Sequence, residues 1–136
     1  MNAEGHLSWW AAALLAGGIA SILNFGLARL AARMLHIPAS FAPFTGLPIL
    51  SGSFGGVFGA MLIYAALLAP HPFPLIYAVT ALVLPASVLL PLRLFRPRPT
   101  RSVRFSGVTA AIAAVLVGLH TVVALCSLYA LRLWTG

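Results

Sequence analysis

Acidic residues are almost absent from this sequence, and lysine is absent altogether. Glu4 is the only acid among 136 residues, whereas eight arginines bring the formal net charge to +7. A single carboxylate cannot supply the pair that acid–base hydrolysis requires. The sequence also holds no nucleophile–base pair and no phosphate-binding glycine loop. The amino-acid inventory therefore argues against an enzyme.

Cysteine is equally scarce, with Cys126 as the only one. One thiol excludes an intrachain disulfide and a cysteine-based metal site. His6 and His71 are both expected near the same membrane surface, but Glu4 is the only other strong ligand close to them. So small a ligand set predicts no metal site, and no cofactor motif is present.

Charged residues of either sign are too few for an ordinary water-soluble domain. They make up 7% of the chain against 62% hydrophobic residues, and the mean hydropathy is +1.06. Soluble domains carry about 25% charged residues because their surfaces face water. Four apolar segments, 8–30, 48–69, 73–92 and 105–131, have about the 20 residues that a helix needs to cross a bilayer. We therefore predict an all-α membrane protein, a four-transmembrane-helix bundle that forms one domain over residues 1–136.

Prolines and glycines interrupt the apolar sequence at the expected helix ends. Residues 37–47 are apolar but too short to cross, so we expect an interfacial segment in which Phe41 and Phe44 dip into the lipid boundary. Pro85 lies inside the third segment and should kink its helix.

The arginines predict the orientation of the bundle. Seven of the eight fall on one side of it: Arg29, Arg33, Arg93, Arg96, Arg98, Arg101 and Arg104. Positive loops stay in the cytoplasm, so both termini are expected on the non-cytoplasmic side of a bacterial inner membrane. Tryptophans and tyrosines, among them Tyr64, are expected as an aromatic belt at the opposite interface.

The loop 93–104 carries a second expectation. Its five arginines, Arg93, Arg96, Arg98, Arg101 and Arg104, should contact anionic lipid headgroups, each contributing about 1 kcal/mol. The same placement beside membrane spans argues against nucleic acid as the partner of these basic residues.

Glycine is concentrated in the second segment. Spacings of four residues there predict a helix-packing face made of Gly52, Gly55, Gly56, Gly59 and Ala60. Such a face lets a second helix backbone approach closely, which is how helices associate in lipid. It could serve packing against the first or last segment, or it could be the interface of a homodimer.

A small set of polar residues falls inside the apolar segments: Ser21, Asn24, Thr80, Ser87 and His120. His120 is expected near the bilayer midplane, where an imidazole is costly unless it is paired, and depth counting offers Thr80 and Ser21 as partners. It could be a neutral structural residue bonded to a hydroxyl or to the carbonyl freed by Pro85, or a proton-relay or substrate-contact group. Asn24 and Ser87 are expected at one depth as a second layer that holds helices together.

The last segment contains Gly118-Leu119-His120-Thr121-Val122-Val123-Ala124-Leu125, and Asn24 and Pro85–Pro91 accompany it. With these features the layout resembles uncharacterised bacterial four-helix integral membrane proteins, a domain of unknown function. The resemblance implies the four-helix layout and no particular activity.

Three functional hypotheses follow from the sequence. The first is a structural, accessory or oligomer-forming membrane subunit, supported by the glycine face and the absence of catalytic groups. The second is a small channel or transporter with a polar pathway around His120. The third, a membrane enzyme, fits the residue inventory least well.

Overall fold

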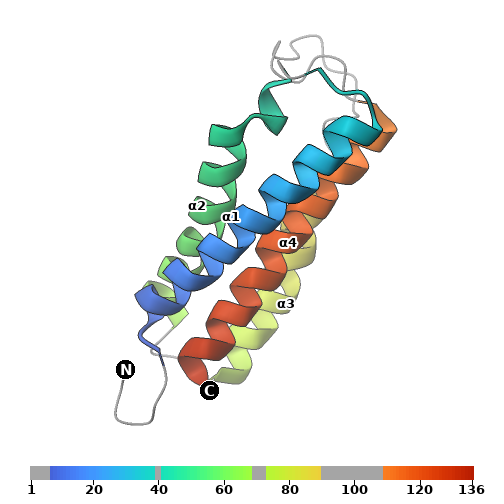
Figure 1. Ribbon diagram of the computed structural model, residues 1–136. Coiled ribbons are helices and arrows are strands. Elements are labelled where there is room, and N and C mark those ends of the chain that lie inside the picture. The colour runs from blue at the N-terminus through green and yellow to red at the C-terminus, as the bar shows by residue number, and fades with distance from the viewer. Residues whose placement is uncertain (1–6, 39–40, 69–72, 90–108) are drawn as a thin grey trace.

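The computed structural model describes residues 7–38, 41–68, 73–89 and 109–136 (Figure 1). Its helices are α1 (Trp9–Met34), α2 (Gly46–Ile63), α3 (Phe73–Leu89) and α4 (Ala110–Thr135), with a 3₁₀ turn η1 (Ala42–Phe44) and a π-helical turn η2 (Tyr64–Leu68). The described ranges contain no strand, so the all-α prediction is confirmed for them.

Three of the helices are long and apolar enough to cross a membrane. They are α1 and α4, with 26 residues each, and the continuous stretch Gly46–Ala66 formed by α2 and the start of η2. The fourth helix, α3, has 17 residues, a length of about 25 Å at 1.5 Å per residue. The hydrocarbon core is about 30 Å thick, and residues 90–92 of the expected third span lie outside the described ranges. The chain is thus a helical membrane protein, and a crossing by α3 stays a prediction.

The end of α1 lies beyond the predicted residue 30 because the helix continues to a defined stop signal. His36 adopts a left-handed backbone with φ of 51°, and the amide of Ile37 donates to the carbonyl of Ala32 at 2.9 Å. This is the bonding pattern of a Schellman C-cap, in which a left-handed residue satisfies the last carbonyls. Helix α4 likewise runs past residue 131, to Thr135.

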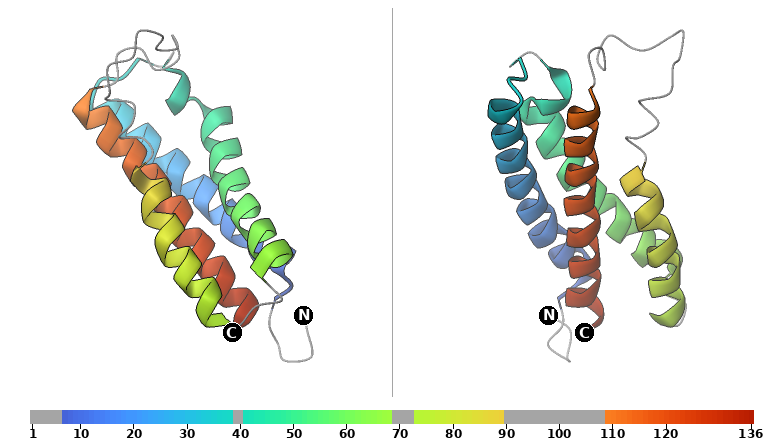
Figure 2. Two further views of the ribbon diagram at one scale, coloured as in Figure 1. Left: turned by 180° about the vertical axis from the view of Figure 1, so that it is seen from behind. Right: turned by 90° about the vertical axis from the view of Figure 1, so that its right-hand side faces the viewer.

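Helix α1 packs against both α2 and α4, which also contact one another (Figures 1 and 2). The face of α1 that makes these contacts consists of small residues, and Ala12, Ala13, Ala16 and Ala20 are fully buried. Small side chains let helix backbones approach closely, which matters in lipid because packing replaces the hydrophobic effect. Helix α3 lies apart from α1 and packs on α4 and η2.

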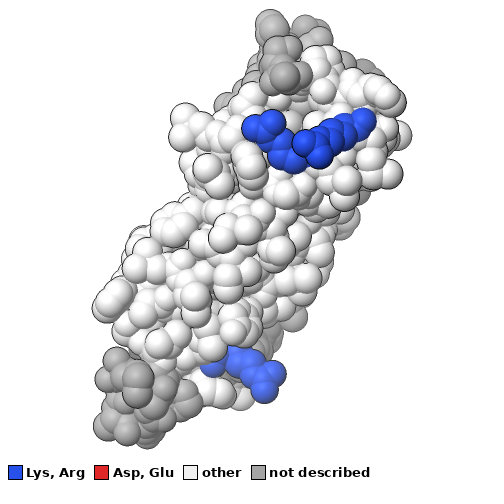
Figure 3. Space-filling view, in the orientation of Figure 1, with Lys and Arg blue, Asp and Glu red and all other residues white. Residues whose placement is uncertain are grey.

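Both described ends of the chain meet at one end of the bundle (Figure 1). The amide of Leu7 donates to the carbonyl of Leu133 at 3.1 Å, which joins the start of α1 to the end of α4. The arginines of the described ranges form two groups at opposite ends of the molecule (Figure 3). Arg29 and Arg33 lie near the end of α1, and Arg132 lies near the end of α4.

The interfacial role expected for the phenylalanines of residues 37–47 is wrong for Phe44. Its side chain is 8% exposed and packs in a core cluster with Ala28, Ile49 and Leu116. Phe41 lies edge-on to Phe44, with ring centroids 5.4 Å apart. The rings are drawn inward because η1 turns the chain back over the bundle before α2 begins.

Candidate functional site

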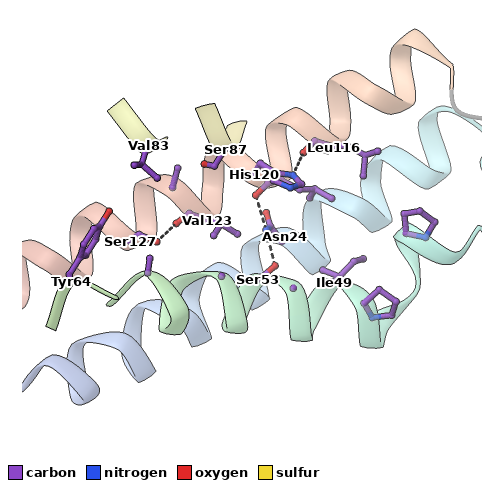
Figure 4. A pocket seen from close by; sticks show the side chains of 17 residues that line it. Asn24, Ile49, Ser53, Tyr64, Val83, Ser87, Leu116, His120, Val123 and Ser127 are labelled. Carbon is purple, nitrogen blue, oxygen red and sulfur yellow. Dashed lines mark hydrogen bonds between the residues drawn. The ribbon is translucent and has the colours of Figure 1, made fainter. Parts of the chain in front are cut away.

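A partly open cleft of about 350 Å³ lies between α1, α2 and α4, with α3 along one edge (Figure 4). We refer to it as the central cleft. Its polar lining residues are Asn24, Ser53, Tyr64, Ser87, His120 and Ser127, and its other lining residues are apolar or glycine. Asn24 and His120 belong to the middle turns of α1 and α4, so the polar groups lie deep within the span.

The central cleft exists because several residues that face it are too small to fill the space between the helices. Gly52, Gly56 and Ala60 line it from α2, and Ala124 lines it from α4. Gly56 also sets how closely these two helices approach, since a β-carbon there would lie 2.8 Å from Cγ1 of Val123. The helices are in close contact at Gly56, and the small residues beside it leave the space unfilled.

Asn24 connects three helices at the floor of the central cleft. Its Nδ2 donates to Oγ of Ser53 in α2 at 2.8 Å and to the carbonyl of Leu119 in α4 at 3.0 Å (Figure 4). The side chain is 1% exposed. A carbonyl oxygen can only accept, so the bond to Leu119 determines which end of the amide carries the nitrogen. Asn24 therefore fixes how α1, α2 and α4 are rotated against one another.

The other end of the same amide has no partner. Oδ1 of Asn24 is a buried acceptor to which no group in the described part of the chain donates. A buried polar atom left without a hydrogen bond costs about 1–3 kcal/mol. Exchanging the amide oxygen and nitrogen would not help, because Oδ1 would then face the carbonyl of Leu119. Oδ1 of Asn24 is thus an acceptor in the central cleft that a donor from outside the described chain would satisfy.

His120 presents a second acceptor to the central cleft. Its Nδ1 lies 2.8 Å from the carbonyl oxygen of Leu116, one turn earlier in α4. Because that carbonyl can only accept, Nδ1 carries a proton, and in the neutral ring Nε2 is left as an acceptor. The partner of His120 is its own helix, not the hydroxyl of Thr80 or Ser21 that depth counting suggested.

The predicted polar set is divided between the central cleft and other contacts. Asn24, Ser87 and His120 line the cleft, whereas Thr80 and Ser21 do not. Thr80 is fully buried, and Ser21 donates to the carbonyl of Gly17 at 2.8 Å in its own helix. The expected layer of Asn24 with Ser87 does not form a bond, because the amide of Asn24 is committed to Ser53 and Leu119.

The sequence analysis did not predict three of the polar residues that line the central cleft, Ser53, Tyr64 and Ser127. Ser53 lies four residues after Ile49 and four before Val57, both buried, and that spacing would have placed it on the inner face of α2. Tyr64 was expected in the aromatic belt but is 4% exposed and lines the cleft. It begins the π-helical turn η2, a feature that often marks functional sites and that has no sequence signal here.

The glycine face of α2 is not a single surface. Gly56 faces α4, as described above, and Ala60 lines the central cleft. A β-carbon at Gly52, Gly55 or Gly59 would meet no described atom within 4 Å, and of these three Gly52 faces the central cleft. We call Gly55 and Gly59 the outer glycine face. Packing within the chain and contact with a second copy, the two alternatives for the glycine face, therefore involve different sides of α2.

Some predicted residues lie outside the described ranges. They are the lipid-contact arginines Arg93, Arg96, Arg98, Arg101 and Arg104, together with Glu4, His6 and His71.

Comparison of the chain with protein-family models, with curated proteins and with solved structures finds no match. The central cleft and the outer glycine face are therefore the features from which a function is proposed.

Proposed function

We propose that this chain is an oligomer-forming, accessory membrane subunit that packs on a neighbouring transmembrane helix through the outer glycine face. The observation that carries the proposal is the open space beside Gly55 and Gly59. Two glycines on one side of a helix weaken it unless they permit close packing, because glycine costs about 0.5–1 kcal/mol relative to alanine in a helix. Close backbone approach is what these residues offer in lipid.

The exposure of α2 supports the same proposal. In its most apolar stretch 28% of the residues are buried, against 44% in α1 and 39% in α4. Helix α2 is therefore the spanning helix with the most surface left for a partner. We take a second copy of this chain as that partner, because an isologous contact of two such faces brings glycines against glycines.

The orientation belongs to the proposal as well. Four crossings in a bacterial inner membrane, with both termini on the non-cytoplasmic side, would bring Arg29 and Arg33 to the same cytoplasmic surface as the loop 93–104. The five arginines of that loop would then contact anionic headgroups. The antiparallel packing of α1 and α4 fits an even number of crossings.

The test compares a residue of the outer glycine face with an exposed alanine of α4. Donor- and acceptor-labelled copies of the full chain are mixed in lipid vesicles, and energy transfer is measured as the lipid is diluted. Gly55→Leu should abolish most of the transfer, since the new side chain blocks the outer glycine face at a position where a β-carbon meets no described atom within 4 Å. Ala114→Leu, at an exposed position of α4, is the matched control and should leave transfer unchanged.

Two results would contradict the proposal. One is a wild-type chain that shows no transfer above random proximity at any lipid dilution. The other is transfer that Gly55→Leu and Ala114→Leu reduce equally, because the loss would then come from bulk on any helix.

A channel or transporter is the second candidate, and the position of His120 favours it. A polar cleft in the middle of the spanning helices is where such a pathway would pass. If it is one, vesicles containing the chain should leak a small solute, and His120→Leu should reduce the flux. Equal flux in vesicles with and without protein would exclude it for that solute.

A further inference from the structure

The central cleft combines unsatisfied acceptors with apolar walls, and this combination defines a class of ligand. We propose that the cleft binds a neutral amphiphile dissolved in the membrane that carries two hydroxyl groups, one donating a hydrogen bond to Oδ1 of Asn24 and the other to Nε2 of His120. This inference goes beyond the proposed subunit function and does not depend on it.

The need for a donor comes from Asn24. Its Oδ1 is buried without a partner, while its Nδ2 is held by Ser53 and Leu119. The chain cannot relieve this by turning the amide, so a donor must come from outside. Because Asn24 is 1% exposed, the donor has to reach the floor of the central cleft and not merely its mouth.

His120 points to the same chemistry. Its Nδ1 is engaged with the carbonyl of Leu116, so the ring offers Nε2 to the central cleft as an acceptor. Leu119, whose carbonyl accepts from Asn24, is the neighbour of His120 in α4. Two acceptors at one level of the cleft favour a pair of neighbouring hydroxyl groups, because each hydroxyl has one proton to donate.

The charges of the protein favour a neutral ligand. Among the described residues, no acid and no arginine lines the central cleft. The arginines of the described ranges lie at the two ends of the molecule, away from its middle (Figure 3). A charged headgroup would therefore be desolvated without a counterion, and such burial is strongly unfavourable.

The remaining lining favours a ligand with an apolar body. Apolar side chains from α2, α3 and α4, such as Ile49, Val83 and Val123, cover most of the central cleft. A volume of about 350 Å³ is at the small end of ligand pockets, which span about 300–1,000 Å³. Since the cleft is partly open, it can hold the hydroxyl end of a longer molecule whose tail stays in the lipid. A phospholipid acyl chain would fill the space but could not donate.

The experiment uses a photoreactive long-chain alcohol with two hydroxyl groups as the probe, a hexadecane-1,2-diol with a diazirine in its chain. The full chain in lipid vesicles is irradiated with this alcohol, or with the dimethyl ether of the same molecule, which keeps the oxygens but has no donor. We expect saturable labelling of cleft residues in α2 and α4 by the alcohol, displaced by unlabelled hexadecane-1,2-diol. The ether should bind about a hundredfold more weakly, about tenfold for each good hydrogen bond lost.

Three variants separate the central cleft from nonspecific labelling. His120→Phe removes one acceptor without breaking a contact between helices, and it should weaken labelling by the alcohol about tenfold. Ala60→Phe places a ring in the cleft and should abolish the labelling. Ser51→Ala removes an exposed hydroxyl outside the cleft and should have no effect.

The inference is overturned if the alcohol and the ether label equally, or if labelling does not saturate and survives Ala60→Phe. Equal labelling is also expected if water alone satisfies the acceptors, because the alcohol then gains no hydrogen bond over the ether. That outcome overturns the inference as well. Gly55→Leu should leave labelling intact even where it separates copies of the chain. This variant therefore distinguishes a failure of self-association from a failure of alcohol binding.

Discussion

Gly56 of α2 lies against Val123 of α4 at a distance that leaves no room for a β-carbon. An added carbon would come within 2.8 Å of Cγ1 of Val123, closer than real β-carbons approach another heavy atom. One turn earlier along α2, Ser53 accepts the hydrogen bond from Asn24. The tight contact of Gly56 with Val123 and the polar contact among three helices are therefore neighbours, and both depend on how α2 is rotated.

Gly56→Ala should destabilise the bundle by about 1–3 kcal/mol, because a methyl group must displace Val123 or push α2 away from α4. Gly55→Ala is the matched control, since it adds the same methyl group where no atom lies within 4 Å. It should be neutral or stabilising by up to about 1 kcal/mol through helix propensity. Denaturation in mixed micelles, followed by circular dichroism, measures both. Equal effects of the two changes would contradict the packing described here.

The hydrogen bond between Asn24 and Ser53 should appear as a coupling energy. A double-mutant cycle with Asn24→Ala and Ser53→Ala should give about 0.6 kcal/mol, the average for hydrogen bonds between membrane helices. The cycle of Asn24→Ala with Ser87→Ala should give no coupling, because the two side chains share no bond. Coupling to Ser87 instead of Ser53 would favour the layer expected from the sequence over the contact in the structure.

The contrast between Ser87 and Ser53 shows what a sequence can and cannot predict in this fold. Long apolar runs predicted where α1, α2 and α4 lie, because a bilayer requires about 20 such residues. Counting residues from helix centres put Asn24 and His120 in separate layers, whereas Asn24 donates to the carbonyl of Leu119, the residue before His120. Depth says nothing about the direction in which a side chain points around its helix, and that direction selected Ser53 as the partner.

Local backbone geometry was the other part that the sequence did not predict. The π-helical turn moved Tyr64 from the expected aromatic belt into the central cleft. The 3₁₀ turn directed Phe44 into the core. In each turn the backbone hydrogen bonds are shifted by one residue relative to an α-helix. Neither turn can be recognised from composition or periodicity.

His36 holds a left-handed conformation at the end of α1, and this makes it a site for stabilisation. Its φ of 51° costs an ordinary residue about 1–2 kcal/mol, whereas glycine adopts it freely. His36→Gly should therefore stabilise the chain by about 1 kcal/mol, and His36→Val should destabilise it. The midpoint of thermal unfolding in detergent gives the sign of each change. A loss of stability with glycine would mean that the imidazole makes a contact that offsets its backbone strain.

The proposed orientation can be tested by thiol labelling from outside the cell. In a Cys126→Ala background, single cysteines are introduced by Ser8→Cys, His36→Cys, His71→Cys, Arg98→Cys and Gly136→Cys. Leu7 and Leu133 are hydrogen-bonded, so Ser8→Cys and Gly136→Cys should react from the same side of the membrane. With both termini on the non-cytoplasmic side, a membrane-impermeant maleimide should label these two and His71→Cys.

Arg98→Cys and His36→Cys should react only after the membrane is permeabilised, because positively charged segments remain in the cytoplasm. The pair His71→Cys and Arg98→Cys examines α3 in particular, since the two positions flank that helix in the sequence. If both react from one side, α3 does not cross and the bundle has fewer than four spans. If all five cysteines show the opposite accessibility, the four crossings are supported but the arginine loop lies outside the cell. The proposed contact with cytoplasmic anionic lipid is then wrong.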